Sequence, residues 1–198
     1  MKNLVYLFIL IVTSFQRVNF QNAEKFRNSV SLEVFQTFSL RHNADIRYCK
    51  DVIVAFPAGY EYLDCCGINI NYQFDKDEFY IQKQKILKKA LYHYSDNDSC
   101  IILLPEFKSK HTPICSDHYI PIFDAYAGKA PLEKGFLPQR GLDYYIFEYK
   151  KGEFLKGEEL KKMDEIDLFH DSTLNHGFSN GAIIDKNDFK IVYFIAIW

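Results

Sequence analysis

Two adjacent cysteines, Cys65 and Cys66, and a distant histidine, His118, are the side chains whose types best fit covalent chemistry. A cysteine attacks a substrate as the thiolate, and a nearby imidazole is the usual group that removes its proton. A fold that brings His118 to either thiol would therefore form the nucleophile and base of a cysteine hydrolase. The competing interpretation is a buried or disulfide-bonded cysteine pair in a turn, which has no catalytic role.

The four residues Asp64-Cys65-Cys66-Gly67 resemble the Asp-Cys-Ser-Gly signature of the NlpC/P60 cell-wall cysteine peptidases. The resemblance implies that Cys65 is the nucleophile and that His118, within His-Tyr-Ile-Pro-Ile, is the base. In that family the cysteine opens a helix, whereas residues 68–72 here alternate between apolar and polar as in a strand. The helix N-terminus that would lower the thiol pKa is therefore not expected in this chain.

A second group, His111, Cys115 and His118, offers imidazole and thiolate ligands of the kind that bind zinc. The spacing matches no standard zinc finger, and Pro113 prevents a helix from presenting His111 and Cys115 on one face. A disulfide from Cys115, for instance to Cys100, would also remove a ligand. We therefore keep metal binding as a hypothesis and expect no cofactor.

The N-terminus has the pattern of a secretory signal peptide. Lys2 precedes the apolar run of residues 4–12, and the small residues Thr13 and Ser14 follow. The run is shorter than the roughly 20 residues that span a bilayer. We expect cleavage after Ser14 and no membrane span in the mature chain, with a buried N-terminal strand or an uncleaved anchor as the alternatives.

Export changes how the five cysteines are interpreted, because disulfides form and persist in oxidising compartments. They are Cys49, Cys65, Cys66, Cys100 and Cys115, which allow two bridges and one free thiol. We expect disulfides, although a mature chain of this length can fold without them.

Composition excludes several classes of protein. The 198 residues are 48% hydrophobic and 17% aromatic, which is too apolar for an intrinsically disordered chain. The formal net charge of -2 argues against a nucleic-acid partner, because binding phosphates needs a surplus of Lys and Arg. What these values favour is a globular domain.

Three segments have helical spacing of apolar residues. Residues 29–41 fit a strand or a helix, and we favour the helix; residues 158–169 also fit one. The clearest helix begins at Asp75, which forms a capping box with Glu78. The stripe of this helix that we expect to face the core comprises Phe79, Lys83, Ile86, Leu87, Ala90, Leu91 and Tyr94.

Strands are predicted between and after these helices. Residues 51–56 and 100–104 fit buried strands, residues 68–72 a half-exposed strand, and residues 144–149 a further strand. Residues 105–142 are irregular and 170–180 are a polar loop, and we expect part of any site to lie in the first of these. Residues 182–185 and 189–198 form a hairpin, whose last strand is apolar on both faces and should lie in the middle of the sheet.

Helices and strands mix without regular alternation, which favours an α+β fold. We expect a signal peptide at 1–14, a polar lead-in at 15–28, and a single α+β domain at 29–198. Its largely antiparallel sheet would carry two or three helices, with the C-terminal strand at its centre.

The favoured function is an exported domain, periplasmic or secreted, that binds an unidentified ligand of the envelope or the extracellular space without catalysis. The alternative is a cysteine hydrolase of the cell envelope that uses Cys65 or Cys66 with His118.

Overall fold

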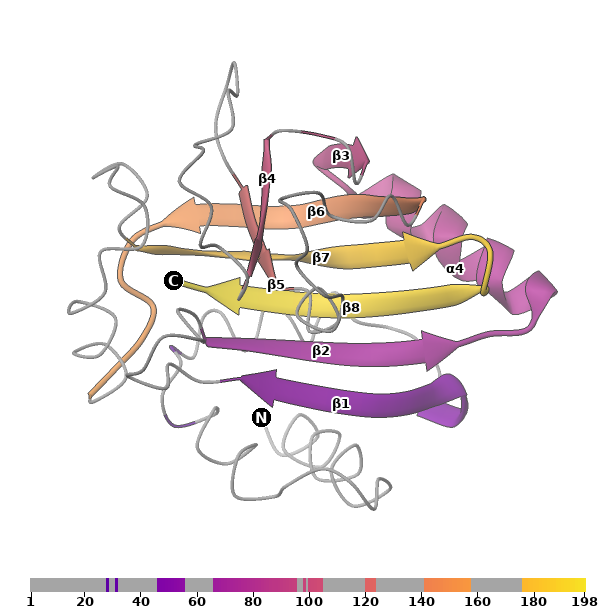
Figure 1. Ribbon diagram of the computed structural model, residues 1–198, viewed down its shortest axis with the longest axis horizontal. Coiled ribbons are helices and arrows are strands. Elements are labelled where there is room, and N and C mark those ends of the chain that lie inside the picture. The colour runs from indigo at the N-terminus through magenta and orange to yellow at the C-terminus, as the bar shows by residue number, and fades with distance from the viewer. Residues whose placement is uncertain are drawn as a thin grey trace, which may run out of the picture.

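A six-stranded antiparallel sheet organises the chain in the computed structural model (Figure 1). The structure describes residues 28, 31, 46–55, 66–95, 98, 100–104, 120–123, 141–157 and 176–198. A short 3-10 helix, η1 (Ile46–Tyr48), leads into the first strand. Across the sheet the strands are β1 (Cys49–Ala55), β2 (Cys66–Gln73), β8 (Lys190–Ile197), β7 (Gly177–Asp185), β6 (Leu142–Lys151) and β3 (Tyr92–Ser95).

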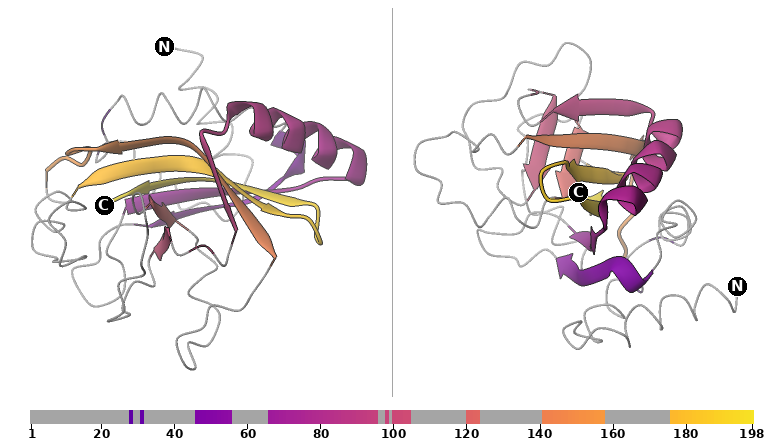
Figure 2. Two further views of the ribbon diagram at one scale, coloured as in Figure 1. Left: turned by 90° about the horizontal axis from the view of Figure 1, so that it is seen from above. Right: turned by 90° about the vertical axis from the view of Figure 1, so that its right-hand side faces the viewer.

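Each face of the sheet is covered by a different layer (Figure 2). The helix α4 (Lys76–Lys89) packs on one face, which we call the helix side, where Phe79 and Ile86 join the core. A two-stranded parallel sheet of β4 (Ile101–Leu104) and β5 (Ile120–Phe123) crosses the opposite face. The large sheet is therefore the middle of three layers.

The last strand, β8, lies between β2 and β7, which confirms that the C-terminal strand is inside the sheet. Ile191, Tyr193 and Ile195 pack on the helix side, while Val192 and Phe194 pack against β4 and β5. A strand buried on both faces needs apolar residues at every position, and this is the pattern that β8 has. The predicted hairpin is confirmed in the pairing of Ile184 with Ile191 and of its neighbours along β7 and β8.

The strand predicted at residues 68–72 is present as part of β2, but the prediction that it is half-exposed is wrong. Asn69 and Asn71 alternate with the apolar residues of β2, yet both are buried. They face the side that β4 and β5 cover, opposite Phe194 and Val192 of β8. By contrast β1, predicted to be buried, is an edge strand whose residues 51–54 are only partly buried.

The predicted N-terminus of the main helix is confirmed. The side chain of Asp75 accepts a hydrogen bond from the Glu78 amide at 2.9 Å, as an N-cap does. The Glu78 carboxylate completes no capping box with Asp75 and instead accepts a hydrogen bond from Gln82 at 2.6 Å. The helix ends at Lys89, because Ala90 is extended and residues 92–95 form the strand β3.

The prediction of an α+β fold with two or three helices is wrong for the described residues, which contain one α-helix and are mostly strand. Two segments account for part of the difference. Residues 92–95 form a strand where the helix was expected to end, and Gly177–Asn180, predicted to be a polar loop, begin β7. The helices expected at 29–41 and 158–169 lie, apart from Ser31, outside the described residues, as do the segment 1–14 and all but Asn28 of the lead-in.

No helix in the described part of the chain is both long and apolar enough to cross a membrane.

Candidate binding surface

Most of the residues predicted to carry chemistry lie outside the described residues. These are Cys65, His111, Cys115 and His118. The His118-dependent hydrolase and the zinc hypothesis therefore stay predictions. Within the described ranges no group of three or more His, Cys, Asp or Glu side chains could hold a metal ion.

Cys66 is the one predicted site residue whose surroundings can be given. It begins β2 opposite Ile197, where its side chain is fully buried in the core on the helix side. A nucleophile must reach its substrate, which a buried side chain does not, but the hydrolase prediction of Cys65 or Cys66 with His118 stays a prediction, because Cys65 and His118 lie outside the described residues.

Two other cysteines are described. Burial, with a smaller contribution from the charge of Asp51, raises the pKa of the Cys49 thiol to about 12, so it stays protonated at neutral pH. Cys100 directly precedes β4, where its amide donates a hydrogen bond to the Asp98 carboxylate at 2.9 Å. The disulfides and their connectivity stay a prediction.

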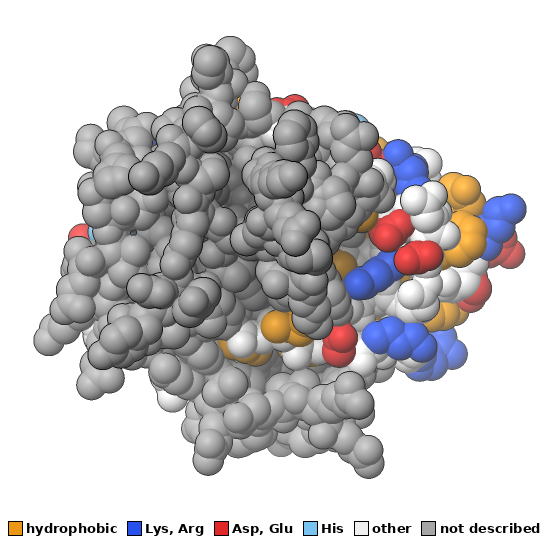
Figure 3. Space-filling view, in the orientation of Figure 1, with side chains coloured by type: hydrophobic (Ala, Val, Ile, Leu, Met, Phe, Trp, Pro, Cys, Tyr) orange, Lys and Arg blue, Asp and Glu red, His pale blue; other side chains and the backbone are white. Residues whose placement is uncertain are grey.

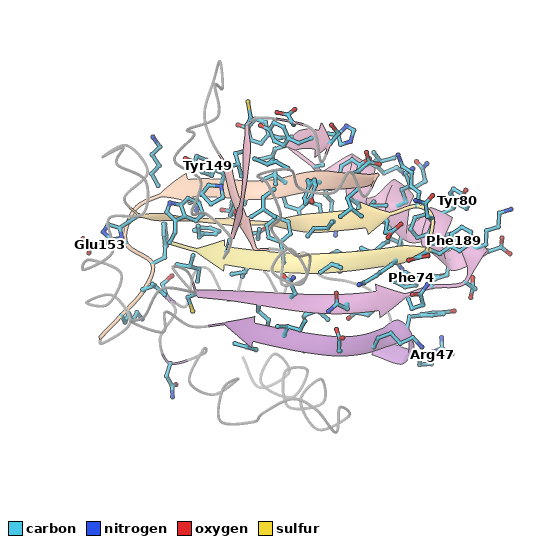
Figure 4. All side chains as sticks on the ribbon, viewed as in Figure 1. Arg47, Phe74, Tyr80, Tyr149, Glu153 and Phe189 are labelled. Atoms are coloured by element: carbon cyan, nitrogen blue, oxygen red, sulfur yellow. The ribbon has the colours of Figure 1, made fainter. Side chains whose placement is uncertain are left out.

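The largest anomaly of the described surface is a set of exposed apolar side chains on α4 and at the start of β3, which we call the α4–β3 surface. All large hydrophobic side chains that are exposed among the described residues belong to it. They are Tyr80 (48% exposed), Ile81 (51%), Leu87 (43%), Leu91 (65%) and Tyr92 (39%). Figure 3 shows apolar and charged side chains intermixed at the end of the molecule where α4 lies, and Figure 4 labels Tyr80 there.

The spacing along α4 explains why two of these residues share a stripe. Tyr80 and Leu87 are seven residues apart, which places them on one stripe of the helix, whereas Leu91 follows the extended Ala90 and leads into β3. The core-facing stripe is a different one, made by Phe79, Gln82 and Ile86. The prediction that Leu87 and Leu91 face the core is therefore wrong.

The exposure of polar and apolar side chains on the two stripes is the reverse of the usual pattern. Gln82, a polar residue, is 2% exposed and satisfied by Glu78, whereas Leu87 and Leu91 are exposed to water. Burying a leucine side chain completely is worth about 1.5–3 kcal/mol, so the isolated chain gives up part of that stabilisation at each of these positions. Contiguous exposed apolar side chains of this kind mark interaction sites on soluble proteins.

The same helix is positively charged. It carries five lysines against two carboxylates, Asp77 and Glu78, although the whole chain has a formal net charge of -2. Lys76, Lys85 and Lys88 are exposed and take no part in an ion pair within the described part of the chain. Their charges are therefore available to a partner.

At its β3 end the surface meets a cluster of charged groups around Asp143. The carboxylate accepts a hydrogen bond from Lys186 at one oxygen, and its other oxygen lies 3.2 Å from Nε2 of His93. His93 also stacks on the Tyr145 ring, with centroids 4.5 Å apart. The cluster thus joins the edge strand β3 to β6 and to the β7–β8 turn.

Electrostatics at Asp143 favour the charged form. Burial raises the pKa of this carboxyl, but hydrogen bonds from Lys186 and His93, with their charges, outweigh burial and hold the pKa below its usual value. The hydrogen bond to Asp143 raises the pKa of Lys186 correspondingly. Among the described residues no hydroxyl or thiol is hydrogen-bonded to His93, and the His-Asp pair ties strands together.

Polar side chains are also buried within the sheet. Asn71 donates to Asp51, and the Ser179 hydroxyl donates to the Pro121 carbonyl of β5. Asn180, on the helix side of β7, is buried with neither amide atom hydrogen-bonded in the structure. The sequence pattern placed Ser179 and Asn180 in a loop, so it gave no signal for these contacts.

No protein-family model, curated protein or solved structure matches the chain. The candidate site therefore rests on the geometry described above.

Proposed function

We propose that the protein is an exported binding protein, and that the α4–β3 surface is where it contacts its partner. One observation carries the proposal: every exposed large hydrophobic side chain of the described residues gathers on this surface. The exposed lysines among these side chains add a charge that a partner can recognise.

The exported location is supported by the N-terminal sequence, in which Lys2, the apolar run at 4–12 and the small residues Thr13 and Ser14 form a signal-peptide pattern. The five cysteines of the chain would form the predicted disulfides in an oxidising compartment. Together they favour a partner in the envelope or outside the cell.

A photo-crosslinking amino acid placed in the exported protein tests the binding surface. Position 87 lies in the α4–β3 surface, and the exposed Lys151, at the end of β6, serves as the control position. We expect a crosslinked adduct at position 87 and none at position 151. Equal adducts at both positions, or no adduct at position 87, would refute the proposal.

The alternative, a cysteine hydrolase that uses Cys65 with His118, predicts a different outcome. Thiol titration of the native protein would then reveal one fast-reacting cysteine, and His118→Ala would abolish its reactivity. Such a result would overturn the non-catalytic proposal, whereas thiols that are all bridged or slow to react would support it.

A further inference from the structure

We propose that the partner of the α4–β3 surface is an anionic phospholipid surface. This inference rests on the proposed function and names the chemistry of the ligand. The helix would lie along the membrane interface, with its exposed apolar side chains among the headgroups and its lysines beside the lipid phosphates.

The apolar side chains have the arrangement that an interfacial helix needs. Tyr80 and Leu87 form one stripe of α4, Ile81 lies on the other flank of its exposed face, and the exposed Leu91 follows the end of the helix. A helix of this kind buries its apolar side chains at the boundary of headgroups and acyl chains without spanning the bilayer. Two of the five exposed side chains are tyrosines, whose rings suit this boundary because they are apolar with a polar tip.

The lysines distinguish a lipid surface from a protein partner. Interfaces between proteins are depleted of lysine, whereas five of the 14 residues of α4 are lysines. A lysine can lay its aliphatic stem along an apolar surface and keep its ammonium group in water, as a membrane interface requires. Lys85 and Lys88 share the exposed face of α4 with Ile81 and Leu87. The same face therefore offers both ionic contacts and apolar contacts.

The position of α4 in the fold allows this contact. The helix is the outer layer over the helix side of the sheet, and its opposite stripe, Phe79, Gln82 and Ile86, is held in the core (Figure 2). The exposed face can therefore meet a flat surface without any rearrangement of the sheet.

Vesicle co-sedimentation of the full chain tests the inference. One set of vesicles is phosphatidylcholine alone, and in the other phosphatidylglycerol replaces about a third of it. We expect binding to the anionic vesicles at about 0.1 M salt and its loss at about 1 M salt, where charges are screened within about 3 Å.

Two variants of the surface are compared with one control. Each lysine near an anionic membrane contributes about a fivefold factor in partitioning, so Lys85→Glu with Lys88→Glu should weaken binding at least about 25-fold. Leu87→Ser with Leu91→Ser should weaken it about tenfold or more, by removing apolar insertion. Lys151→Glu with Lys156→Glu makes the same change of net charge in and just after β6, and it should bind like the unmodified chain.

All variants share the apolar N-terminal run, so differences between them report on α4 alone. Equal binding to neutral and anionic vesicles, or equal weakening by the control variant, would overturn the inference. An adduct to protein at position 87, combined with no preference for anionic vesicles, would remove the lipid partner and leave the proposed binding surface intact. No adduct at position 87 would overturn both the lipid partner and the proposed binding surface.

Discussion

Asp143 shows how a single residue secures the edge of the sheet. Its carboxylate is mostly buried and bonds Lys186 in the β7–β8 turn and His93 in the short edge strand β3. Because the pKa of Asp143 is lower in the folded chain, folding favours the carboxylate. The stabilisation is present above about pH 4, the value of an unperturbed carboxyl, and is lost as the pH falls through the lower folded-state pKa.

Asp143→Asn should lower the free energy of unfolding at pH 7 by about 1 kcal/mol, a modest value because Lys186 and His93 are half exposed and screened by water. The difference from the unmodified chain should shrink toward zero as the pH falls through the lowered folded-state pKa of Asp143, where the native aspartate itself becomes protonated. Urea denaturation at pH 7 and over a series of lower pH values measures this. Glu153→Gln, at an exposed position, is the matched control (Figure 4), and a difference that persisted at low pH would contradict the electrostatic explanation.

At the scale of elements, α4 has two faces with opposite roles. Ile86 is packed in the core with Phe79, while its neighbour Leu87 is exposed on the α4–β3 surface. Stability and the proposed binding therefore depend on adjacent residues of one helix. The same element also places Gln82 in the core, where it is satisfied by a hydrogen bond within the helix.

Ile86→Ala should lower the free energy of unfolding by about 2–5 kcal/mol, because it removes buried methyl groups and leaves a cavity. Leu87→Ala, one residue further along, should change it by less than about 0.5 kcal/mol. The pair is its own control, because both substitutions place alanine in the same helix. Chemical denaturation measures both values, and a large loss at Leu87 would show that this side chain is covered in solution.

At the scale of the whole molecule, the fold depends on contacts between distant parts of the chain. β8 pairs with β2, more than a hundred residues earlier, and the helix layer and the β4–β5 layer cover it on opposite faces. At its end, the Trp198 amide and carbonyl both pair with Gly177. Trp198, which follows the last residue of β8, is therefore also held in the middle of the sheet.

Deleting residues 195–198 should abolish cooperative folding. All four side chains are buried, and their contribution is comparable with the 5–15 kcal/mol that stabilises a typical domain. Calorimetry checks this, and a soluble truncated protein with a cooperative melt would contradict it. Deleting residues 1–14, the predicted signal peptide, is the control truncation and should leave the melting temperature unchanged.

The sequence by itself determined those features that depend on neighbours along the chain. The N-cap at Asp75, the hairpin near residue 187 and the doubly apolar strand β8 could each be predicted from local spacing. Local patterns report which residues share a face, because side-chain direction repeats with the period of a helix or a strand.

Only the tertiary structure decided which faces are covered. Asn69 and Asn71 look like the exposed face of a strand, yet β4 and β5 bury them; Leu87 and Leu91 look like a core stripe, yet they face water. Burial depends on layers brought from distant segments, and a local pattern carries no information about them. For the same reason the candidate surface emerged only when the exposure of each side chain was known.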